Sequence, residues 1–482
     1  MFDARPVGYV IGLLVAVLGA AMLLPMLADL LRGDPHWMVF FECAVITGLS
    51  GGLIALACSN SLGRGLNIQQ SFLLTTGVWI ALPAFGALPF MMGVPGASFT
   101  DAMFESMSGM TTTGATVFVG LDDMPAGTLL WRGMLQWLGG LGIVIVALIF
   151  LPVMKVGGMQ FFRSEGFDTL GKILPRALDI SSALIQVYVA LTVACTIVYY
   201  SLGMTGFDAL VHALTTIATG GFSTTDASFA AFRGPLEYAS TVFMLLATLP
   251  FIRYVQVLNG SVTPLWQDLQ VRAYLRWAFY AIVAVVLYRS YTQDVPFFVI
   301  LRETTFNIVT LFSGTGYGSA DVTSWGAFSF VVIIIVGMIG GCTSSTGCSI
   351  KVFRYLVLLE GIKAQVRRIQ SPSRVIPVRL GGRAVGEDVL NSVIVLFTCF
   401  ILTFGLTAVA LSMTGLQTLT ALTAAWTAIF NIGPAFGPEV GPTGAVDAFP
   451  ALAKWLMIFA MLLGRLELLA VFVLFVPRFW RG

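Results

Sequence analysis

Charged side chains are scarce in this sequence. Only 10% of its 482 residues are Asp, Glu, Lys or Arg, whereas 57% are hydrophobic and the mean hydropathy is +0.90. An ordinary soluble domain is about 25% charged, so this composition excludes a soluble globular protein. The sequence therefore predicts an all-α integral membrane protein.

Side chains for metal or redox chemistry are also few. The two histidines, His36 and His212, lie far apart, and no CxxC pair occurs among the six cysteines. Zinc and haem therefore lack a ligand set. No cluster of His, Cys, Asp or Glu falls inside a hydrophobic run, so we expect neither an enzyme nor a bound cofactor.

Long hydrophobic runs make up most of the chain. Ten are long enough to cross a bilayer, which takes roughly 20 residues: 7–31, 38–59, 71–93, 128–154, 182–203, 238–257, 274–291, 325–359, 389–412 and 455–476. Between the third and fourth, fifth and sixth, seventh and eighth, and ninth and tenth runs lie four shorter segments with polar ends. We interpret these as re-entrant pore helices, which enter the membrane and return on the same side.

Basic residues are distributed unequally between the two sides that this topology defines. With the N- and C-termini inside, 19 of the 26 Lys and Arg are cytoplasmic, six are outside, and Arg465 lies within the tenth run. This bias is the positive-inside pattern, and counting the first short segment as a crossing would place the basic stretch 155–176 outside.

Acidic residues gather in the predicted outer loops, where they either concentrate cations or are ordinary solvated loop residues. They are Asp101, Glu105, Asp122, Asp123, Asp208, Asp226, Glu237, Asp294, Glu303, Asp321, Glu439 and Asp447.

The four short segments end in similar glycine-bearing loops. Aligned on Gly114, Gly220, Gly314 and Gly433, they are 106 (114 to 220), 94 (220 to 314) and 119 (314 to 433) residues apart. This near-constant spacing is typical of a fourfold internal repeat. Glycine permits positive φ, so carbonyl oxygens can turn toward a dehydrated cation, and the negative end of each helix dipole favours that cation further.

The motifs TTTGAT, TGGFST, SGTGYG and NIGPAFGP, with GGMQFFRSEG and MLLGRLELL, resemble the superfamily of Trk, Ktr and HKT potassium transporters. The similarity is closest to the TrkH family of bacterial Trk-type membrane subunits and covers nearly the whole chain. It implies a K+-selective pore in the bacterial inner membrane, a homodimer, and K+ as the substrate and the metal ion at the filter. The filter residues that it implies are Thr112, Thr113, Gly114, Thr219, Gly220, Gly221, Ser313, Gly314, Thr315, Asn431, Ile432 and Gly433. Hydroxyl residues precede three of the aligned glycines, but Ile432 precedes the fourth, so we expect an asymmetric filter.

The pattern predicts five regions around one pseudo-fourfold pore. A two-helix extension (1–66) precedes four parallel repeats of span, pore helix, filter and span, at 67–180, 181–272, 273–386 and 387–482. The third repeat is expected to contain a broken last helix and a basic cytoplasmic loop. Substrate-coupled secondary transporters usually carry inverted repeats, so an unrelated transporter of this kind is a remote alternative.

The eighth run is too long and too polar at its centre for one straight helix. Its middle holds Gly340, Gly341, Cys342, Thr343, Ser344, Ser345, Thr346 and Gly347. Non-helical backbone at membrane depth is tolerated where it lines a cavity, so we expect a gate below the third filter, as the resemblance also implies. A glycine-packed helix crossing is the alternative.

Arg465 is a second anomaly, because an arginine inside a membrane run is costly unless it is paired or hydrated. We expect it to act with the gate, repelling cations and donating to the carbonyls of residues 340–349. The alternative is a packing arginine that extends to the cytoplasmic interface.

The segment 351–388 carries eight basic and three acidic residues. It suits either anionic lipid or a cytosolic protein. A GxxxxGK[ST] motif is absent, so regulation by nucleotide requires another subunit; the resemblance implies a TrkA-like cytosolic nucleotide-binding regulator. We expect no nucleic-acid partner.

Two modes of transport fit the sequence. Passive, gated permeation is the simpler one, and symport with protons or sodium is the alternative. A proton relay needs carboxylates inside the membrane, for which Glu42 and Glu467 are the predicted candidates.

Overall fold

The computed structural model describes residues 3–61, 66–149 and 177–480. The basic stretch 155–176 and the GGMQFFRSEG motif lie outside these residues. The described chain is mostly helical, as predicted; its one sheet is a small antiparallel hairpin of β1 (Arg379–Leu380) and β2 (Arg383–Ala384).

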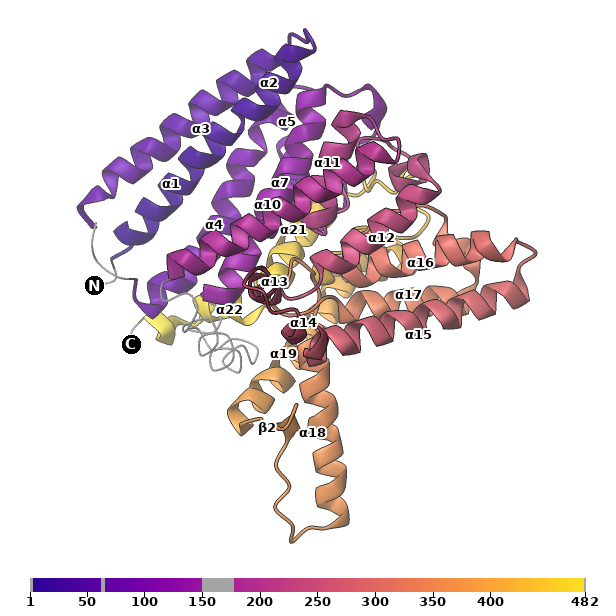
Figure 1. The fold of residues 1–482 in the computed structure, drawn as a ribbon. Helices are drawn as coiled ribbons and strands as arrows, with labels where there is room; N and C mark the ends of the chain where they lie inside the picture. The colour runs from indigo at the N-terminus through magenta and orange to yellow at the C-terminus, as the bar shows by residue number, and fades with distance from the viewer. Residues whose placement is uncertain (1–2, 62–65, 150–176, 481–482) are drawn as a thin grey trace.

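The N-terminal extension stands to one side of the molecule. It consists of α1 (Arg5–Ala21), α2 (Leu23–Leu31) and α3 (Trp37–Ala57), followed by the short η1 (Ser59–Ser61). Figure 1 shows α1 and α3 running side by side along the edge of the helix bundle.

The chain after the extension divides into four parts, and each part contains a long helix, a short pore helix and a returning helix. The first has α4 (Ile68–Gly86), α5 (Leu88–Met92), α6 (Phe99–Met110), η2 (Leu121–Asp123) and α7 (Ala126–Ile149). The second has α10 (Ala177–Ser201), α11 (Gly206–Ile217), η3 (Ser228–Phe232), α12 (Pro235–Ala247), α13 (Phe251–Leu258) and α14 (Thr263–Gln267). The third has α15 (Leu269–Thr292), α16 (Phe297–Ser313), η4 (Val322–Trp325), α17 (Ala327–Ile339) and α18 (Val352–Gln370). The fourth has α19 (Glu387–Met413), α20 (Thr418–Phe430), α21 (Ala451–Arg465), α22 (Leu469–Phe472), η5 (Val473–Phe475) and η6 (Pro477–Trp480).

The pore helices α6, α11, α16 and α20 are too short to cross a membrane. They contain 12, 12, 17 and 13 residues, against roughly 20 for a full crossing. Two begin with the same cap: the Ser98 hydroxyl accepts from the Asp101 N–H at 3.2 Å, and the Thr205 hydroxyl accepts from the Asp208 N–H at 3.1 Å. The cap satisfies amide groups that lack partners within the helix.

Three of the ten predicted spans are broken. In the described residues, seven helices are long and apolar enough to cross a membrane, or nine if each of two bent pairs counts as one span. The break in the eighth run was predicted: α17 ends at Ile339 and α18 begins at Val352. The breaks in the sixth and tenth runs were not predicted.

The sixth span bends by 92° between α12 and α13, and the tenth bends by 104° after Arg465. Pro250 stands at the first bend and cannot continue a helix, because its ring excludes the backbone of the preceding turn. At the second bend Glu467 and Leu468 have positive φ of 60° and 49°, a conformation that an α-helix does not allow.

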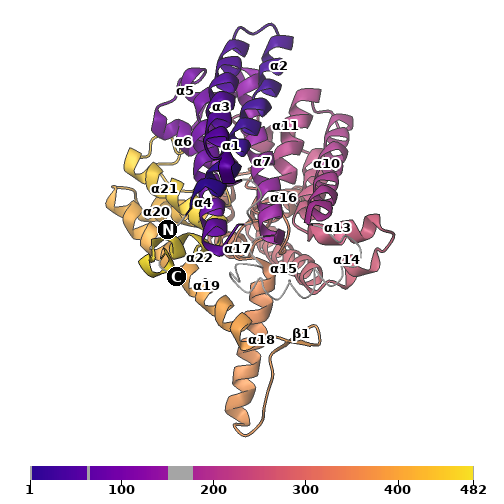
Figure 2. The same ribbon diagram turned by 90° about the vertical axis from the view of Figure 1, so that its left-hand side faces the viewer.

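Figure 1 and Figure 2 show α18 and the β-hairpin projecting from one end of the bundle.

Candidate functional site

The four pore helices end in the same backbone turn. In each, an amide donates to the carbonyl five residues earlier: Thr113 to Ser108 at 2.9 Å, Gly220 to Thr215 at 2.8 Å, Thr315 to Thr310 at 2.8 Å and Ile432 to Thr427 at 3.1 Å. The residue before each amide has positive φ: 52° at Thr112, 52° at Thr219, 77° at Gly314 and 51° at Asn431. The shared geometry makes these loops structurally equivalent.

A glycine with positive φ follows each turn. These glycines are Gly114 (86°), Gly221 (79°), Gly316 (85°) and Gly433 (116°). The alignment predicted from the sequence is therefore out of register by one residue at Gly220 and by two at Gly314. Gly316 was not selected from the sequence, because the third loop, SGTGYG, offers three glycines and the sequence does not show where the helix ends.

The four glycines form a closed ring. A Cβ added at Gly114 would overlap the carbonyl of Gly220, one at Gly221 that of Thr315, and one at Gly316 that of Ile432. The ring closes where a Cβ at Gly433 would lie 3.0 Å from the Thr113 carbonyl oxygen. Each repeat thus packs its glycine on the backbone of the next, which only glycine permits at this conformation.

The ring faces a small cavity. The cavity has a volume of about 140 Å³, and all four ring glycines line it. Asp226 also lines it, and its carboxylate accepts from the amides of Gly120 at 2.9 Å and Leu121 at 3.1 Å.

Several other acidic residues of the predicted outer side are instead engaged in ion pairs. Asp101 pairs with Lys454 at 2.6 Å, Glu237 with Arg302 at 2.8 Å and Glu303 with Arg289 at 3.0 Å. These pairs favour structural roles over a general acidic vestibule.

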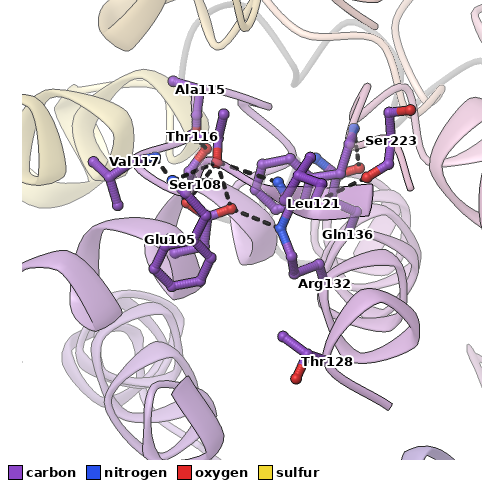
Figure 3. A network of polar contacts seen from close by, with 12 residues as sticks. Glu105, Ser108, Ala115, Thr116, Val117, Leu121, Thr128, Arg132, Gln136 and Ser223 are labelled. Carbon is purple, nitrogen blue, oxygen red and sulfur yellow. Dashed lines mark hydrogen bonds and ion pairs between the residues drawn. The ribbon is translucent and has the colours of Figure 1, made fainter. Parts of the chain in front are cut away.

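A buried ion pair connects the first two filter loops (Figure 3). Arg132 on α7 donates to Glu105 on α6 at 2.8 Å and to the Ser223 carbonyl at 2.9 Å. Glu105 accepts in turn from the Val117 amide at 3.0 Å. One helical turn on, Gln136 donates to the Gly220 carbonyl at 2.7 Å and accepts from the Phe222 amide at 3.0 Å.

The sequence pattern placed Glu105 in an outer loop and Arg132, within the run 128–154, among the six basic residues outside; Gln136 was not selected. The i, i+4 spacing of Arg132 and Gln136 in an apolar helix was the available signal.

Threonine hydroxyls of the pore helices accept hydrogen bonds from the backbone of the third and fourth loops. The Thr310 hydroxyl accepts from the Tyr317 amide at 2.8 Å, and the Thr427 hydroxyl accepts from the Gly433 amide at 2.8 Å. Asn431 donates to the Thr113 hydroxyl at 2.9 Å and so connects the fourth loop to the first. The bracing thus differs from loop to loop, although the backbone turn is shared.

The loop 340–351 lies on the opposite side of the ring from the cavity. Gly340, Gly341, Cys342, Thr343, Ser344, Ser345, Thr346 and Gly347 are all buried. The Thr346 hydroxyl contacts the carbonyls of Ile217, at the end of α11, and Ala247, each at 3.0 Å. Ser349 donates to the Phe430 carbonyl at the end of α20 at 3.0 Å. The loop is thus fixed beneath the ends of two pore helices.

Two further contacts place this loop directly below the ring. The Cys348 sulfur lies 3.5 Å from the Thr112 hydroxyl, and a Cβ at Gly314 would lie 3.1 Å from the Cys348 Cβ. The bend in the sixth span also serves the loop, because the Phe251 amide after Pro250 donates to the Ser344 carbonyl at 2.9 Å.

Arg465 is buried against the loop. Its Nη1 donates to the Thr346 carbonyl at 3.4 Å and to the Cys348 sulfur at 2.9 Å. Nε and Nη2 have no hydrogen-bond partner among the described residues. None of the ion pairs among the described residues involves Arg465, so no carboxylate of these residues neutralises its positive charge, which acts on the space below the ring.

Because of the sharp bend after Arg465, the Glu467 side chain lies against α18. Its carboxylate contacts Arg354 on α18, and Lys351 lies 4.0 Å away. Of the two expected intramembrane carboxylates, Glu467 is buried, whereas Glu42 is exposed on α3 within the candidate span Trp37–Ala57. Each buried carboxylate of the described residues contacts a basic side chain or a histidine; they are Asp29, Glu105, Glu237, Asp268 and Glu467.

Known proteins with this architecture are cation transporters. The family profile TrkH, described as "Cation transport protein", matches residues 36–481. The Trk system potassium uptake protein TrkI of Halomonas elongata is 38% identical over 99% of this chain and 97% of its own length. The Trk system potassium uptake protein TrkH of Escherichia coli K12 is 34% identical, with 99% of each chain covered.

A solved structure agrees over the full length. The crystal structure of the potassium transporter TrkH from Vibrio parahaemolyticus matches with a TM-score of 0.91 and 31% identity, covering 100% of both chains. A family match over most of the chain, relatives above 30% identity and a common fold lead to one assignment. This chain belongs to the TrkH family of cation transport proteins.

Proposed function

We propose that this protein takes up K+ across the bacterial inner membrane through the ring of filter loops. The supporting observation is the closed contact of four equivalent glycine turns around one axis. The relatives that match over the full length are potassium uptake proteins by name. The five regions predicted from the sequence remain the proposed domain organisation.

In this proposal, backbone oxygens of the filter residues replace the hydration shell of K+. The filter consists of Thr112, Thr113, Gly114, Thr219, Gly220, Gly221, Ser313, Gly314, Thr315, Asn431, Ile432 and Gly433, with Gly316 added from the geometry. The C-terminal ends of four pore helices point their partial negative charge at the same place.

The loop 340–347 and Arg465 form the proposed gate. The loop lies below the ring, where Cys348 at its end contacts Thr112, and the positive field of Arg465 opposes a cation there. Opening requires the loop to leave its contacts with α11 and α20. The bends at Pro250 and Glu467 provide room for a buried loop between the broken helices.

Regulation is assigned to a TrkA-like cytosolic nucleotide-binding subunit that docks on the basic segment 351–388. Arg367 and Arg374 are exposed on α18 and the loop after it, which project from the bundle (Figure 1). The homodimer and the cytoplasmic location of both termini complete the proposal.

Passive permeation is favoured over symport, because every buried carboxylate of the described residues is paired with an arginine or a histidine. The deciding experiment measures Rb+ and K+ flux in proteoliposomes while pH and Na+ gradients are varied separately. We expect the reversal potential to follow K+ alone. A reversal potential that moves with either of the other gradients would establish coupling, and no K+ flux with active regulator present would refute the proposed function.

A further inference from the structure

An apolar cavity lies between the N-terminal extension and the first pore repeat. Its volume is about 330 Å³, and α1, α4 and α7 form its walls, with residues such as Leu14, Val78 and Leu138. Among the described residues, Thr75 is the one hydroxyl residue in its lining, and its hydroxyl already donates to the Ser71 carbonyl at 2.8 Å. Such a lining offers water few partners and favours an apolar occupant.

The location of the cavity identifies its occupant. All three walls belong to segments apolar enough to cross a membrane, Arg5–Leu31, Ile68–Met92 and Ala126–Val146. Two lining residues of α1 are also exposed on the surface, Leu14 at 38% and Val17 at 63%, so the cavity borders the lipid phase. Its volume is more than twice that of an apolar cavity of about 150 Å³ that binds benzene. We propose that the cavity is a binding site for one acyl chain of a membrane phospholipid.

The occupant would touch two parts of the transport machinery. Met110, the last residue of pore helix α6, lines the cavity. Trp79 lines it as well, and the guanidinium carbon of Arg465 lies 5.9 Å from the centre of the Trp79 ring. An acyl chain packed against Trp79 therefore holds that ring beside Arg465. This link rests on the proposed gate; the binding site does not.

Gly142 provides the means to fill the cavity. A Cβ added there would meet Trp79 alone, at 3.9 Å, so a larger side chain can enter the cavity without striking the backbone. Gly52 on α3 is a matched control, because a Cβ there meets nothing within 4 Å. Gly142→Phe and the smaller Gly142→Leu, compared with Gly52→Phe, separate filling the cavity from adding bulk to a membrane helix.

The test uses the full-length protein in nanodiscs that contain a phospholipid with a photoactivatable diazirine in one acyl chain. We expect cross-links to peptides of α1, α4 and α7, reduced at least tenfold by Gly142→Phe, partly by Gly142→Leu and not by Gly52→Phe. Absence of these cross-links in the unaltered protein, or equal cross-linking in folded Gly142 variants, would overturn the site.

Rb+ flux in proteoliposomes tests the link to Arg465. The aromatic ring introduced by Gly142→Phe competes with Trp79 for space, so this variant should raise basal flux at least twofold over Gly52→Phe. Equal flux would overturn the link and leave the acyl-chain site. Cross-linking requires no transport, so a failure of the proposed K+ function would show as absent flux in the unaltered protein with cross-linking intact.

Discussion

Gly316 and Gly318 lie two residues apart in one loop and line the same small cavity, yet they differ in their surroundings. At Gly316 φ is 85° and a Cβ would overlap the Ile432 carbonyl, whereas at Gly318 a Cβ would meet nothing within 4 Å. An L-residue in the left-handed region costs roughly 1–2 kcal/mol, before any overlap is relieved. This difference makes the pair a matched test of the filter.

We expect Gly316→Ala to lower the selectivity for K+ over Na+ by about tenfold or more, which corresponds to roughly 1.4 kcal/mol. Gly318→Ala should leave selectivity close to that of the unaltered protein. Bi-ionic reversal potentials in proteoliposomes measure both. Equal selectivity in the two variants would contradict the register assigned to the third loop.

Arg132 carries the contact between the first two filter loops, and it is 1% exposed. Replacing it with Gln leaves the Glu105 carboxylate buried without its ion pair, which typically costs about 3–5 kcal/mol. We expect a markedly lower midpoint of thermal unfolding and impaired selectivity.

Lys363→Ala is the comparison for Arg132, because its pair with Glu360 at 2.8 Å is largely exposed. Exposed pairs contribute about 0–1 kcal/mol, so this variant should unfold almost normally. A similar unfolding midpoint for both variants would show that the Arg132 network does not stabilise the filter.

At the scale of single elements, we expect the loss of either the intramembrane loop or Arg465 to raise the basal flux. Arg465→Ala removes the positive field and the contacts to Thr346 and Cys348, so basal Rb+ flux without a regulator should rise. Arg465→Lys retains the charge and should stay closer to the low flux of the unaltered protein. Partial deletion of residues 340–347 should act in the same direction as Arg465→Ala.

Destabilisation is the competing effect, since unpaired buried carbonyls cost about 1–3 kcal/mol each. Flux is therefore expressed per folded protein and compared with the unfolding midpoint. A lower flux at unchanged stability in both the Arg465→Ala and the deletion variants would exclude the gate and assign Arg465 a role in conduction.

The elements that could be predicted from the sequence are those set by length and hydropathy. The four pore helices were predicted because their segments are short and polar at their ends. The break in the eighth run was predicted because that run is too long and too rich in small polar residues for one straight helix. Pro250 was a visible signal for the bend in the sixth span. The bend at Glu467 had no local signal, because the partner that turns its carboxylate, Arg354, is 113 residues away in the chain.

The register of the filter loops could not be predicted from the sequence for a similar reason. The turn is defined by a hydrogen bond that reaches back five residues, as from Thr315 to Thr310, and by the sign of φ at Gly314. Several glycines in one loop satisfy the composition equally well. The bracing by Arg132 and Gln136 depends on contacts between α7 and a loop that lies 84 to 91 residues later.

At the scale of the whole molecule, α18 and the loop after it offer exposed basic residues at one end of the bundle. We expect Arg367→Glu with Arg374→Glu to weaken association with a cytosolic regulator, and to do so most at low salt, where charge attraction is least screened. Arg368 is left unchanged because it donates to the Ile376 carbonyl at 3.0 Å. Binding to the immobilised regulator at several salt concentrations measures the effect.

The control reverses Arg272 and Arg276, which are exposed on α15 and lie on the same side of the membrane in the predicted topology. It changes the net charge equally and should bind almost normally. If the two pairs of variants bind equally, the docking surface lies elsewhere.

The closed ring of Gly114, Gly221, Gly316 and Gly433 is built from one polypeptide. In a tetramer of identical subunits, any substitution in the filter appears four times and alters every side of the pore together. Here a single codon changes one quarter of the ring and leaves the other three intact. Ion preference can therefore evolve, or be engineered, in graded steps, and the four loops are free to acquire different sequences, as Thr113, Gly220, Thr315 and Ile432 already show.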